Sequence, residues 1–340
     1  MEFMLKIEIP KSVKQIAHQQ KILSIGSCFT EHIGNALKEV KFDLLQNPHG
    51  ILFDPLAVCT SLISYIDNKQ YGEEDLFFLN ELWHSWDHHS RFSHTDRSTT
   101  LHKINESQGQ AHHFLKEADW LIITFGSAFS YKLKEQTFSS DPSTYPIDGN
   151  KKSVANCHRA PAQWFTKHLS TIDEIVTRLN NTIHQLFRFN PHLNIIFTIS
   201  PVRHIRDGVV DNNRSKARLI ESVHHLIHKF NNLYYFPSYE LVIDVLRDYR
   251  FYDVDMVHPN YSATEFVLKK FMETYMNEDT IKLVLELKQI AIARKHRTSH
   301  PGTEAHKQFL AAHYQKTKTI QERFSYLNLE EELTYFSQSP

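Results

Sequence analysis

Short apolar runs separated by longer amphipathic stretches are the feature that most restricts the fold of this chain. Four apolar runs are predicted strands: 22–25, 120–125, 194–200 and 233–236. The amphipathic stretches, which we predict to be helices, cover 30–40, 55–66, 172–189, 215–230, 240–248 and 262–276. Strands that alternate with helices are typical of a parallel sheet covered by helices. We therefore predict an α/β fold in which helices sandwich a parallel sheet.

The first apolar run ends in a glycine and a serine. Gly26 and Ser27 close this run and lead directly into the predicted helix 30–40. A serine at the carboxyl end of a strand can present its hydroxyl at the sheet edge, where helix amides face developing negative charge. A Gly-Ser pair is also ordinary turn chemistry. Ser27 is therefore a candidate nucleophile that needs further support.

That support comes from a carboxylate and an imidazole near the other end of the chain. Asp255 precedes His258 by three residues, a spacing that on a helical turn places both side chains on one face. The carboxylate can then orient the imidazole and stabilise its cation. Asp253 lies five residues before His258 and falls off that face. We predict His258 as the base and Asp255 as its orienting acid.

Two other strand ends carry polar residues. Gly126 and Ser127 follow the second apolar run, and the segment 201–204, which ends in Arg203 and His204, follows the third. The carboxyl ends of parallel strands line one crevice, so we expect these residues near Ser27. His204 and His158 lack an acidic residue three positions earlier, which favours a binding or structural role over that of a base.

Several ordered sequence blocks resemble one protein family. The stretch Gly26-Ser27-Cys28-Phe29-Thr30 resembles the motif that names the GSCFA family, with threonine in place of the final alanine. Further blocks that resemble it lie at 47–55, 83–90, 154–159, 200–204, 213–217, 236–240 and 248–259. The resemblance covers about residues 20–275. It implies an SGNH-hydrolase-like, flavodoxin-like fold and a serine nucleophile, and it favours Ser27 over its neighbour Cys28.

The resemblance also implies a set of oxyanion donors. In SGNH-like enzymes these are the amide of the serine, here Ser27, a glycine amide, here that of Gly50, and an asparagine side chain. No asparagine stands where the wider SGNH superfamily would have one after Gly126. Ser127 and Asn156 are both candidates for the third donor. His158, Arg203 and His204 are the predicted substrate-binding residues.

The implied reaction is acyl transfer through an acyl-enzyme on Ser27. Release by water makes the chain a serine esterase of an acyl ester, with O-acetylated carbohydrates as one class of substrate. Release by an acceptor alcohol makes it an O-acyltransferase. The missing asparagine favours a third interpretation, a catalytically inactive domain that binds a glycan or another ligand. A metal-dependent hydrolase is a fourth, which the histidine spacing disfavours.

Composition limits the remaining possibilities. The net charge of −1 gives no global field that would attract nucleic acid or an acidic membrane. The three cysteines have no C-x-x-C spacing, and no apolar run is long enough for a signal peptide or a membrane span, so we expect a cytoplasmic protein. The 23 histidines are scattered and show no zinc-binding spacing. We expect neither a metal nor an organic cofactor.

Two regions depart from the α/β pattern. Residues 73–115 form a polar insertion, for which a loop packed over the sheet edge and a lid are both open interpretations, and 137–154 also resembles a loop. We predict a hydrolase domain over 1–277 and a charged helical extension over 278–340, with a break at 296–303 and a helix over 305–324. The extension is a candidate surface for a protein partner or for self-association.

Overall fold

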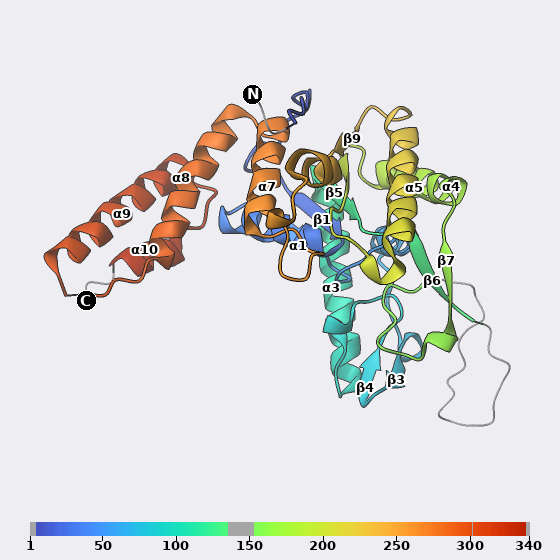
Figure 1. Ribbon diagram of the computed structural model, residues 1–340. Coiled ribbons are helices and arrows are strands. Elements are labelled where there is room, and N and C mark those ends of the chain that lie inside the picture. Colours follow the sequence, from blue (N-terminus) through green and yellow to red (C-terminus); the bar gives the residue numbers. More distant parts are fainter. Residues whose placement is uncertain (1–4, 135–152, 301, 338–340) are drawn as a thin grey trace. The chain divides into compact units, whose positions relative to one another are not determined.

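The fold is built on one mainly parallel sheet. The computed structural model describes residues 5–134, 153–300 and 302–337 (Figure 1). The five strands of the sheet in this part of the chain are, in spatial order, β2 (Leu44–Gln46), β1 (Ile22–Gly26), β5 (Trp120–Phe125), β8 (Asn194–Ile199) and β9 (Leu233–Phe236). β1, β5, β8 and β9 run parallel to one another. Every residue of β1, β5 and β8 is buried, as expected for a sheet covered on both faces.

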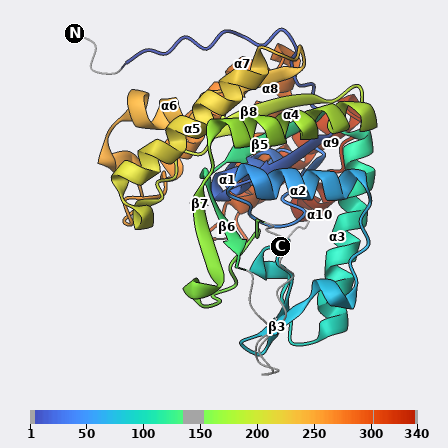
Figure 2. The same cartoon turned by 90° about the vertical axis from the view of Figure 1, so that its right-hand side faces the viewer.

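One face of the sheet packs against a layer of helices. Alternate residues of the strands, such as Leu23, Ile123 and Phe197, join the main hydrophobic core. The helices that complete this core are α2 (Pro55–Ile66), α3 (Arg97–Glu117), α4 (Ile172–Phe189) and α5 (Val209–Ile227). In Figure 2, α2 and α4 lie in front of the sheet. The predicted α/β fold is confirmed.

The remaining elements of this region are short or border the sheet. Ser238, at the start of α6 (Ser238–Glu240), donates from Oγ to the carbonyl oxygen of Ile199 in β8 at 2.7 Å. A π-helical segment, η5 (Leu241–Leu246), follows α6. The others are α1 (Cys28–Glu39), α7 (Tyr261–Tyr275), the hairpin β6 (Phe129–Leu133) with β7 (Phe165–Leu169), and the 3₁₀ turns η3 (Ala162–Trp164), η4 (Ile205–Asp207) and η6 (Tyr249–Phe251).

The strand order creates a switch point between β1 and β5. The chain passes from β1 to β2 on one side and then returns to place β5 on the other side of β1. This is the flavodoxin-like order, in which ligands bind outside the carboxyl ends of the two strands that flank the switch. Gly26 pairs with Thr124 at these ends, so the residues that follow, Ser27 and Gly126, are neighbours.

The insertion at 73–115 is more regular than its sequence suggests. It contains η1 (Glu73–Asp75), β3 (Phe77–Leu79), β4 (Leu82–His84), η2 (Ser90–Phe92) and most of α3. The loop expectation therefore fails for α3, which is a polar helix that buries only a narrow stripe: Thr100, Ile104, Gln108, Ala111 and Leu115. Of the other predicted loop, residues 137–152 lie outside the described part.

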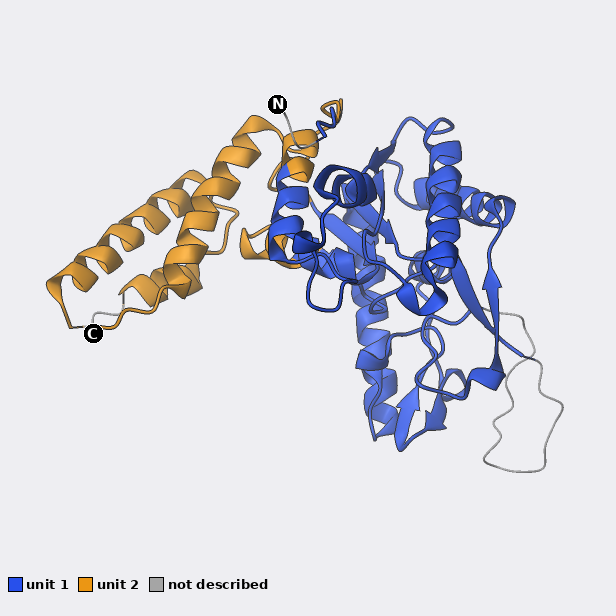
Figure 3. Cartoon of the chain, viewed as in Figure 1, with its two compact units in different colours: residues 1–8, 21–34, 45–269 blue, residues 9–20, 35–44, 270–340 orange. Residues whose placement is uncertain are grey.

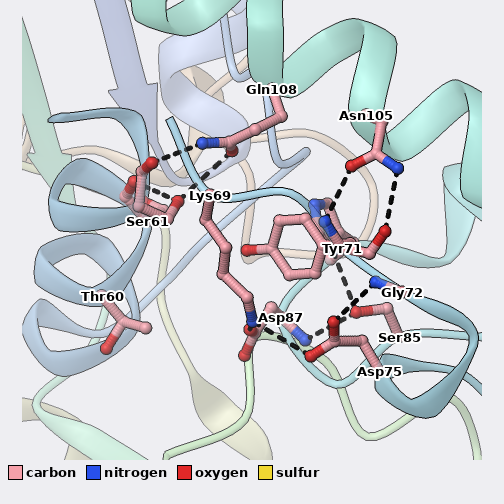
Figure 4. A network of polar contacts seen from close by, with 12 residues as sticks. Thr60, Ser61, Lys69, Tyr71, Gly72, Asp75, Ser85, Asp87, Asn105 and Gln108 are labelled. Atoms are coloured by element: carbon pink, nitrogen blue, oxygen red, sulfur yellow. Dashed lines mark hydrogen bonds and ion pairs between the residues drawn. The ribbon is translucent and has the colours of Figure 1, made fainter. Parts of the chain in front are cut away.

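Polar contacts hold the insertion to Lys69 and Tyr71, which lie between α2 and the insertion (Figure 4). The Asn105 side chain accepts from the Tyr71 N–H at 2.9 Å and donates to the Tyr71 carbonyl at 3.0 Å. Lys69 Nζ lies 3.0 Å from Asp75 Oδ1 and 3.8 Å from Asp87 Oδ2, above the Tyr71 ring. These contacts make the insertion a packed element of the fold, as the interpretation of a segment packed over the sheet edge requires.

The chain divides into two compact units (Figure 3). Unit 1 takes in 1–8, 21–34 and 45–269, and unit 2 takes in 9–20, 35–44 and 270–340. Unit 2 contains α8 (Glu278–Lys295), α9 (Glu304–Arg323) and α10 (Glu330–Ser337). Two N-terminal segments thus belong with the C-terminal helices, and the domain boundary at 277 stays a prediction.

Unit 2 is joined by contacts between residues far apart in the sequence. Ile16 forms a parallel bridge with Met276, and the His18 N–H donates to Thr280 Oγ1 at 3.0 Å. Arg294 contacts Glu331 and Glu332 of α10, each at 2.9 Å. None of the described helices is both long and apolar enough to cross a membrane.

Candidate active site

Ser27 is the first residue after β1 and is held by backbone contacts. The Ser27 N–H donates to the Thr124 carbonyl at 3.1 Å, and the preceding Gly26 N–H donates to Asn47 Oδ1 at 2.9 Å. Gly26 has φ +142°, and a Cβ there would lie 2.1 Å from the Thr124 oxygen, so only glycine fits. The Ser27 side chain is 1% exposed, and its Oγ has no hydrogen-bond partner among the described residues.

Phe53, Ser27 and His204 all lie close to Gly126. A Cβ on Gly126 would stand 3.1 Å from Phe53 Cδ1, 3.2 Å from Ser27 Cβ and 3.4 Å from His204 Nε2. His204 therefore reaches from the end of β8 to the immediate surroundings of Ser27. Its Nε2 is buried and has no partner in the described part of the chain. The sequence predicts this gathering of strand ends, and the structure brings Ser27 and His204 together.

The Asp255 and His258 side chains pair directly. His258 Nδ1 donates to Asp255 Oδ2 at 2.6 Å, while Asp255 Oδ1 accepts from the N–H groups of Val257 and His258 at 2.9 and 3.0 Å. The hydrogen bond from the His258 ring is the main cause that lowers the pKa of Asp255 to about 2. The segment is a turn with Met256 at φ +58° rather than the helical turn assumed from the spacing.

The loop that carries His258 is attached to the end of β8. The Arg203 N–H donates to the Val257 carbonyl at 3.2 Å. The Arg203 guanidinium lies over the Tyr252 ring, 4.4 Å from its centroid. Positive charge on His258 is among the causes that lower the pKa of His204. Because Ser27 Oγ is unbonded within the described residues, the serine–histidine contact of the predicted triad is not formed in this structure.

Two of the predicted oxyanion donors have backbone acceptors already. The Ser27 N–H is bonded to Thr124, and the Gly50 N–H donates to the Asn47 carbonyl at 2.7 Å. Gly50 has φ +83°, and a Cβ there would lie 2.2 Å from the Cβ of His89. The insertion therefore packs tightly against the loop that carries Gly50.

The two candidates for the third donor also have partners. Ser127 Oγ accepts from the Phe129 N–H at 3.0 Å and lies 3.3 Å from Ser215 Oγ. Asn156 Oδ1 accepts from the His158 N–H at 2.7 Å. The oxyanion roles of these groups therefore stay predictions.

His158 lies with the aromatic residues of the insertion. Its Nε2 donates to the Ser85 carbonyl at 2.9 Å, and its ring centroid is 4.5 Å from that of His84 and 5.6 Å from that of Phe77. Burial lowers the pKa of His158 to about 4. These contacts give His158 a place in the packing of the insertion, and its predicted role in substrate binding stays a prediction.

Lys216 is a residue of this region to which sequence analysis assigned no role. Its side chain is buried, and its Nζ donates to the carbonyls of Gly126 and Ser200, both at 2.6 Å. Burial lowers the pKa of Lys216 to about 7. Its neighbour Ser215 accepts from the Ala128 N–H at 2.7 Å. The sequence signal that could have identified this residue is a lysine on the buried face of α5, three residues before Leu219.

All three cysteines are free thiols, and burial is the main cause that raises the pKa of Cys28, the alternative nucleophile. A raised pKa keeps this thiol protonated and less reactive. The described residues contain no group of three or more His, Cys, Asp or Glu side chains that could hold a metal ion.

Comparisons with known proteins identify a family. The profile of the GSCFA family matches residues 21–271, and that of the C-terminal domain of GSCFA domain proteins matches 287–339. No curated protein matches the chain.

Two solved structures resemble the fold distantly. One is a carbohydrate esterase family 3 protein from Talaromyces cellulolyticus, with 7% identity and a TM-score of 0.36, covering 80% of this chain and 99% of that one. The other is the acetyl xylan esterase Est2A from Butyrivibrio proteoclasticus, with 11% identity and a TM-score of 0.34, covering 76% of this chain and 64% of that one.

Proposed function

The chain belongs to the GSCFA family, and from that premise we propose that it is a serine esterase that hydrolyses an acyl ester. Ser27 is the nucleophile, His258 the general base and Asp255 the residue that orients the imidazole. The observation that carries the proposal is the bond from His258 Nδ1 to Asp255 Oδ2 at 2.6 Å. This bond fixes the tautomer that leaves His258 Nε2 free to accept a proton.

The reaction follows from these roles. Ser27 Oγ attacks the ester carbonyl carbon while its proton passes to His258 Nε2, and the carbonyl π electrons move to oxygen. The tetrahedral intermediate collapses, the C–O bond to the alcohol breaks, and the alcohol leaves with the proton from His258. Water then attacks the acyl-enzyme in the same way, which releases the acid and restores Ser27. Ser27 and His258 are not hydrogen-bonded in this structure, so their side chains must approach each other when the substrate binds. Catalytic hydrogen bonds are often long in empty sites and shorten in the complex with substrate.

The surroundings of Ser27 favour a small acyl group. Phe53 and His204 both stand within 3.4 Å of the point where a Cβ on Gly126 would lie, and Ser27 is almost fully buried. An acetyl group fits such a space better than a long acyl chain. O-acetylated carbohydrates, together with simple acetyl esters, are therefore the substrates to test first.

The best experiment measures the intact mass of the protein after treatment with a fluorophosphonate. Wild type should gain the mass of one phosphonyl group, and Ser27→Ala and His258→Ala should not. Cys28→Ala is the matched control next to the nucleophile and should label like wild type. Labelling of folded Ser27→Ala would refute the assignment of the nucleophile.

A second candidate function is a ligand-binding domain without catalysis. It is favoured by the absence of a bond from Ser27 Oγ to any described residue and by the engaged amides of Ser27 and Gly50. Folded wild-type protein that neither labels nor hydrolyses 4-nitrophenyl acetate would support this candidate. Faster release of 4-nitrophenol on addition of an acceptor alcohol, with an acylated alcohol as product, would instead identify an acyltransferase.

A further inference from the structure

His204 carries a second assignment, which rests on the proposed function. We propose that the neutral imidazole of His204 donates a hydrogen bond from Nε2–H to the oxyanion that forms when Ser27 attacks the ester. This makes His204 a catalytic residue of the site, in the position where the wider superfamily uses an asparagine side chain. Three observations support this assignment: the hydrogen bonds that the predicted donors already make, the geometry at Gly126 and the environment of the His204 ring.

The predicted donors leave a need for another group. The Ser27 and Gly50 N–H groups donate to backbone carbonyls, and the Ser127 and Asn156 side chains accept from backbone N–H groups. The Ser27 and Gly50 N–H groups would therefore have to leave their present acceptors before they could donate to an oxyanion. His204 Nε2 has no partner to lose within the described residues.

The geometry places this nitrogen beside the reacting serine. His204 Nε2 and Ser27 Cβ lie on two sides of one point, 3.4 and 3.2 Å from it, which a side chain at position 126 would fill. Because Gly126 has no side chain, no methyl group of its own separates His204 Nε2 from Ser27, and an ester oxygen that packs against Gly126 can reach both residues. In the wider superfamily an asparagine that follows β5 would supply this donor. Here the chain lacks that asparagine, and His204 reaches Gly126 from the end of β8.

The ring of His204 is held in this orientation. Its backbone N–H donates to Asn212 Oδ1 at 2.9 Å, and its ring meets the Phe53 ring edge-on, with centroids 5.6 Å apart. Lys216 bonds the Ser200 and Gly126 carbonyls, so the strand ends that carry His204 and face Ser27 are tied together. A donor fixed before the reaction costs no reorganisation when the charge develops.

The environment of His204 suits a donor better than a base. Burial is the main cause that lowers the pKa of His204 to about 4, and the charge of Lys216 is the second. The charge of Asp207 acts in the opposite direction and those of His258 and Lys167 in the same direction, so the ring remains neutral near pH 7. A neutral imidazole keeps one N–H to donate. The paired carboxylate belongs to His258, which remains the base.

The test compares substitutions that keep or remove the donor. In His204→Gln an amide N–H can replace Nε2–H, whereas His204→Leu has a similar volume and no donor. We expect His204→Leu to lower kcat for 4-nitrophenyl acetate roughly 100- to 1,000-fold, and His204→Gln to recover at least about tenfold of that loss. His225→Leu, an exposed histidine of α5, is the matched control and should behave like wild type.

The remaining outcomes separate this proposal from its rivals. An increase in KM with unchanged kcat in His204→Leu would make His204 a substrate-binding residue and overturn the proposal. If His204 is the base, the acid limb of the pH profile disappears or moves in His204→Gln; if it is the donor, that limb does not move. Failure of wild type to label with fluorophosphonate would refute the proposed function itself, whereas normal labelling with unimpaired His204→Leu would refute the present inference alone.

Discussion

Substitution of Gly126 by alanine tests the space between Ser27 and His204 directly. The backbone of Gly126 does not have a positive φ, so alanine can adopt its conformation. The new methyl group would lie 3.1 Å from Phe53 Cδ1, 3.2 Å from Ser27 Cβ and 3.4 Å from His204 Nε2. Each of these contacts is shorter than the usual separation of about 3.5–4.0 Å, so the three side chains must move by a few tenths of an ångström.

The expected effects on stability and on activity differ in size. Overpacking by one methyl group costs about 1–3 kcal/mol, and the less flexible unfolded chain returns about 0.4–1 kcal/mol. We therefore expect a net loss of about 0–2.6 kcal/mol in the free energy of unfolding, small enough for the protein to stay folded. Activity should fall about 100-fold, since the methyl group displaces the nucleophile and occupies the space for the ester oxygen.

The assay measures both quantities on the same protein. Urea unfolding gives the free energy of unfolding, and hydrolysis of 4-nitrophenyl acetate gives kcat/KM. Gly109→Ala is the control, because Gly109 lies within α3 and a Cβ there would meet nothing within 4 Å. It should gain about 0.5–1 kcal/mol from helix propensity and keep its activity. Wild-type kcat/KM in folded Gly126→Ala would refute the placement of the reaction at this point.

Two further predictions concern single charged groups. Asp255→Asn should lower kcat roughly 1,000- to 10,000-fold by losing the orientation of His258, while Asp253→Asn in the same turn should be nearly neutral; equal losses would contradict the assignment. Burial lowers the pKa of Lys216 to about 7 from the usual lysine value of 10.5, so the native state binds fewer protons than the unfolded state between these pH values and its stability rises with pH. Urea unfolding should show a gain of about 1.5 kcal/mol from pH 7 to pH 8.5 in wild type and a smaller one in Lys216→Met; an unchanged gain would disprove this explanation.

Elements with uninterrupted apolar patterns could be predicted from the sequence. β5 and β9 and the helices α2 and α4 have the predicted bounds, because their buried residues are almost all apolar and regularly spaced. The hairpin of β6 and β7 was missed, since FSYKL and FTKHL carry as many polar as apolar side chains. α5 begins at Val209 rather than at residue 215, because its first turn exposes Val209 and Val210 and shows no buried apolar stripe.

In the site, too, a contact between residues close in the sequence could be predicted, whereas contacts between residues far apart in the sequence could not. Asp255 and His258 are three residues apart, so their contact could be inferred from spacing, and it is present in the structure. The position of His204 Nε2 beside Ser27 depends on the strand order and on Gly126, neither of which spacing reveals. The hydrogen bonds of Lys216 depend on how α5 packs beside the ends of β5 and β8.

Unit 2 is built from segments that are far apart in the sequence, and this sets the order in which they can assemble during translation. His18 meets Thr280, 262 residues later, and Ile16 pairs with Met276. At about 5–20 residues per second, roughly 15–50 s pass between the synthesis of His18 and that of its partner. Throughout this interval, segment 9–20 has none of its contacts with α8. Of the two units, unit 2 is therefore the later one to be completed.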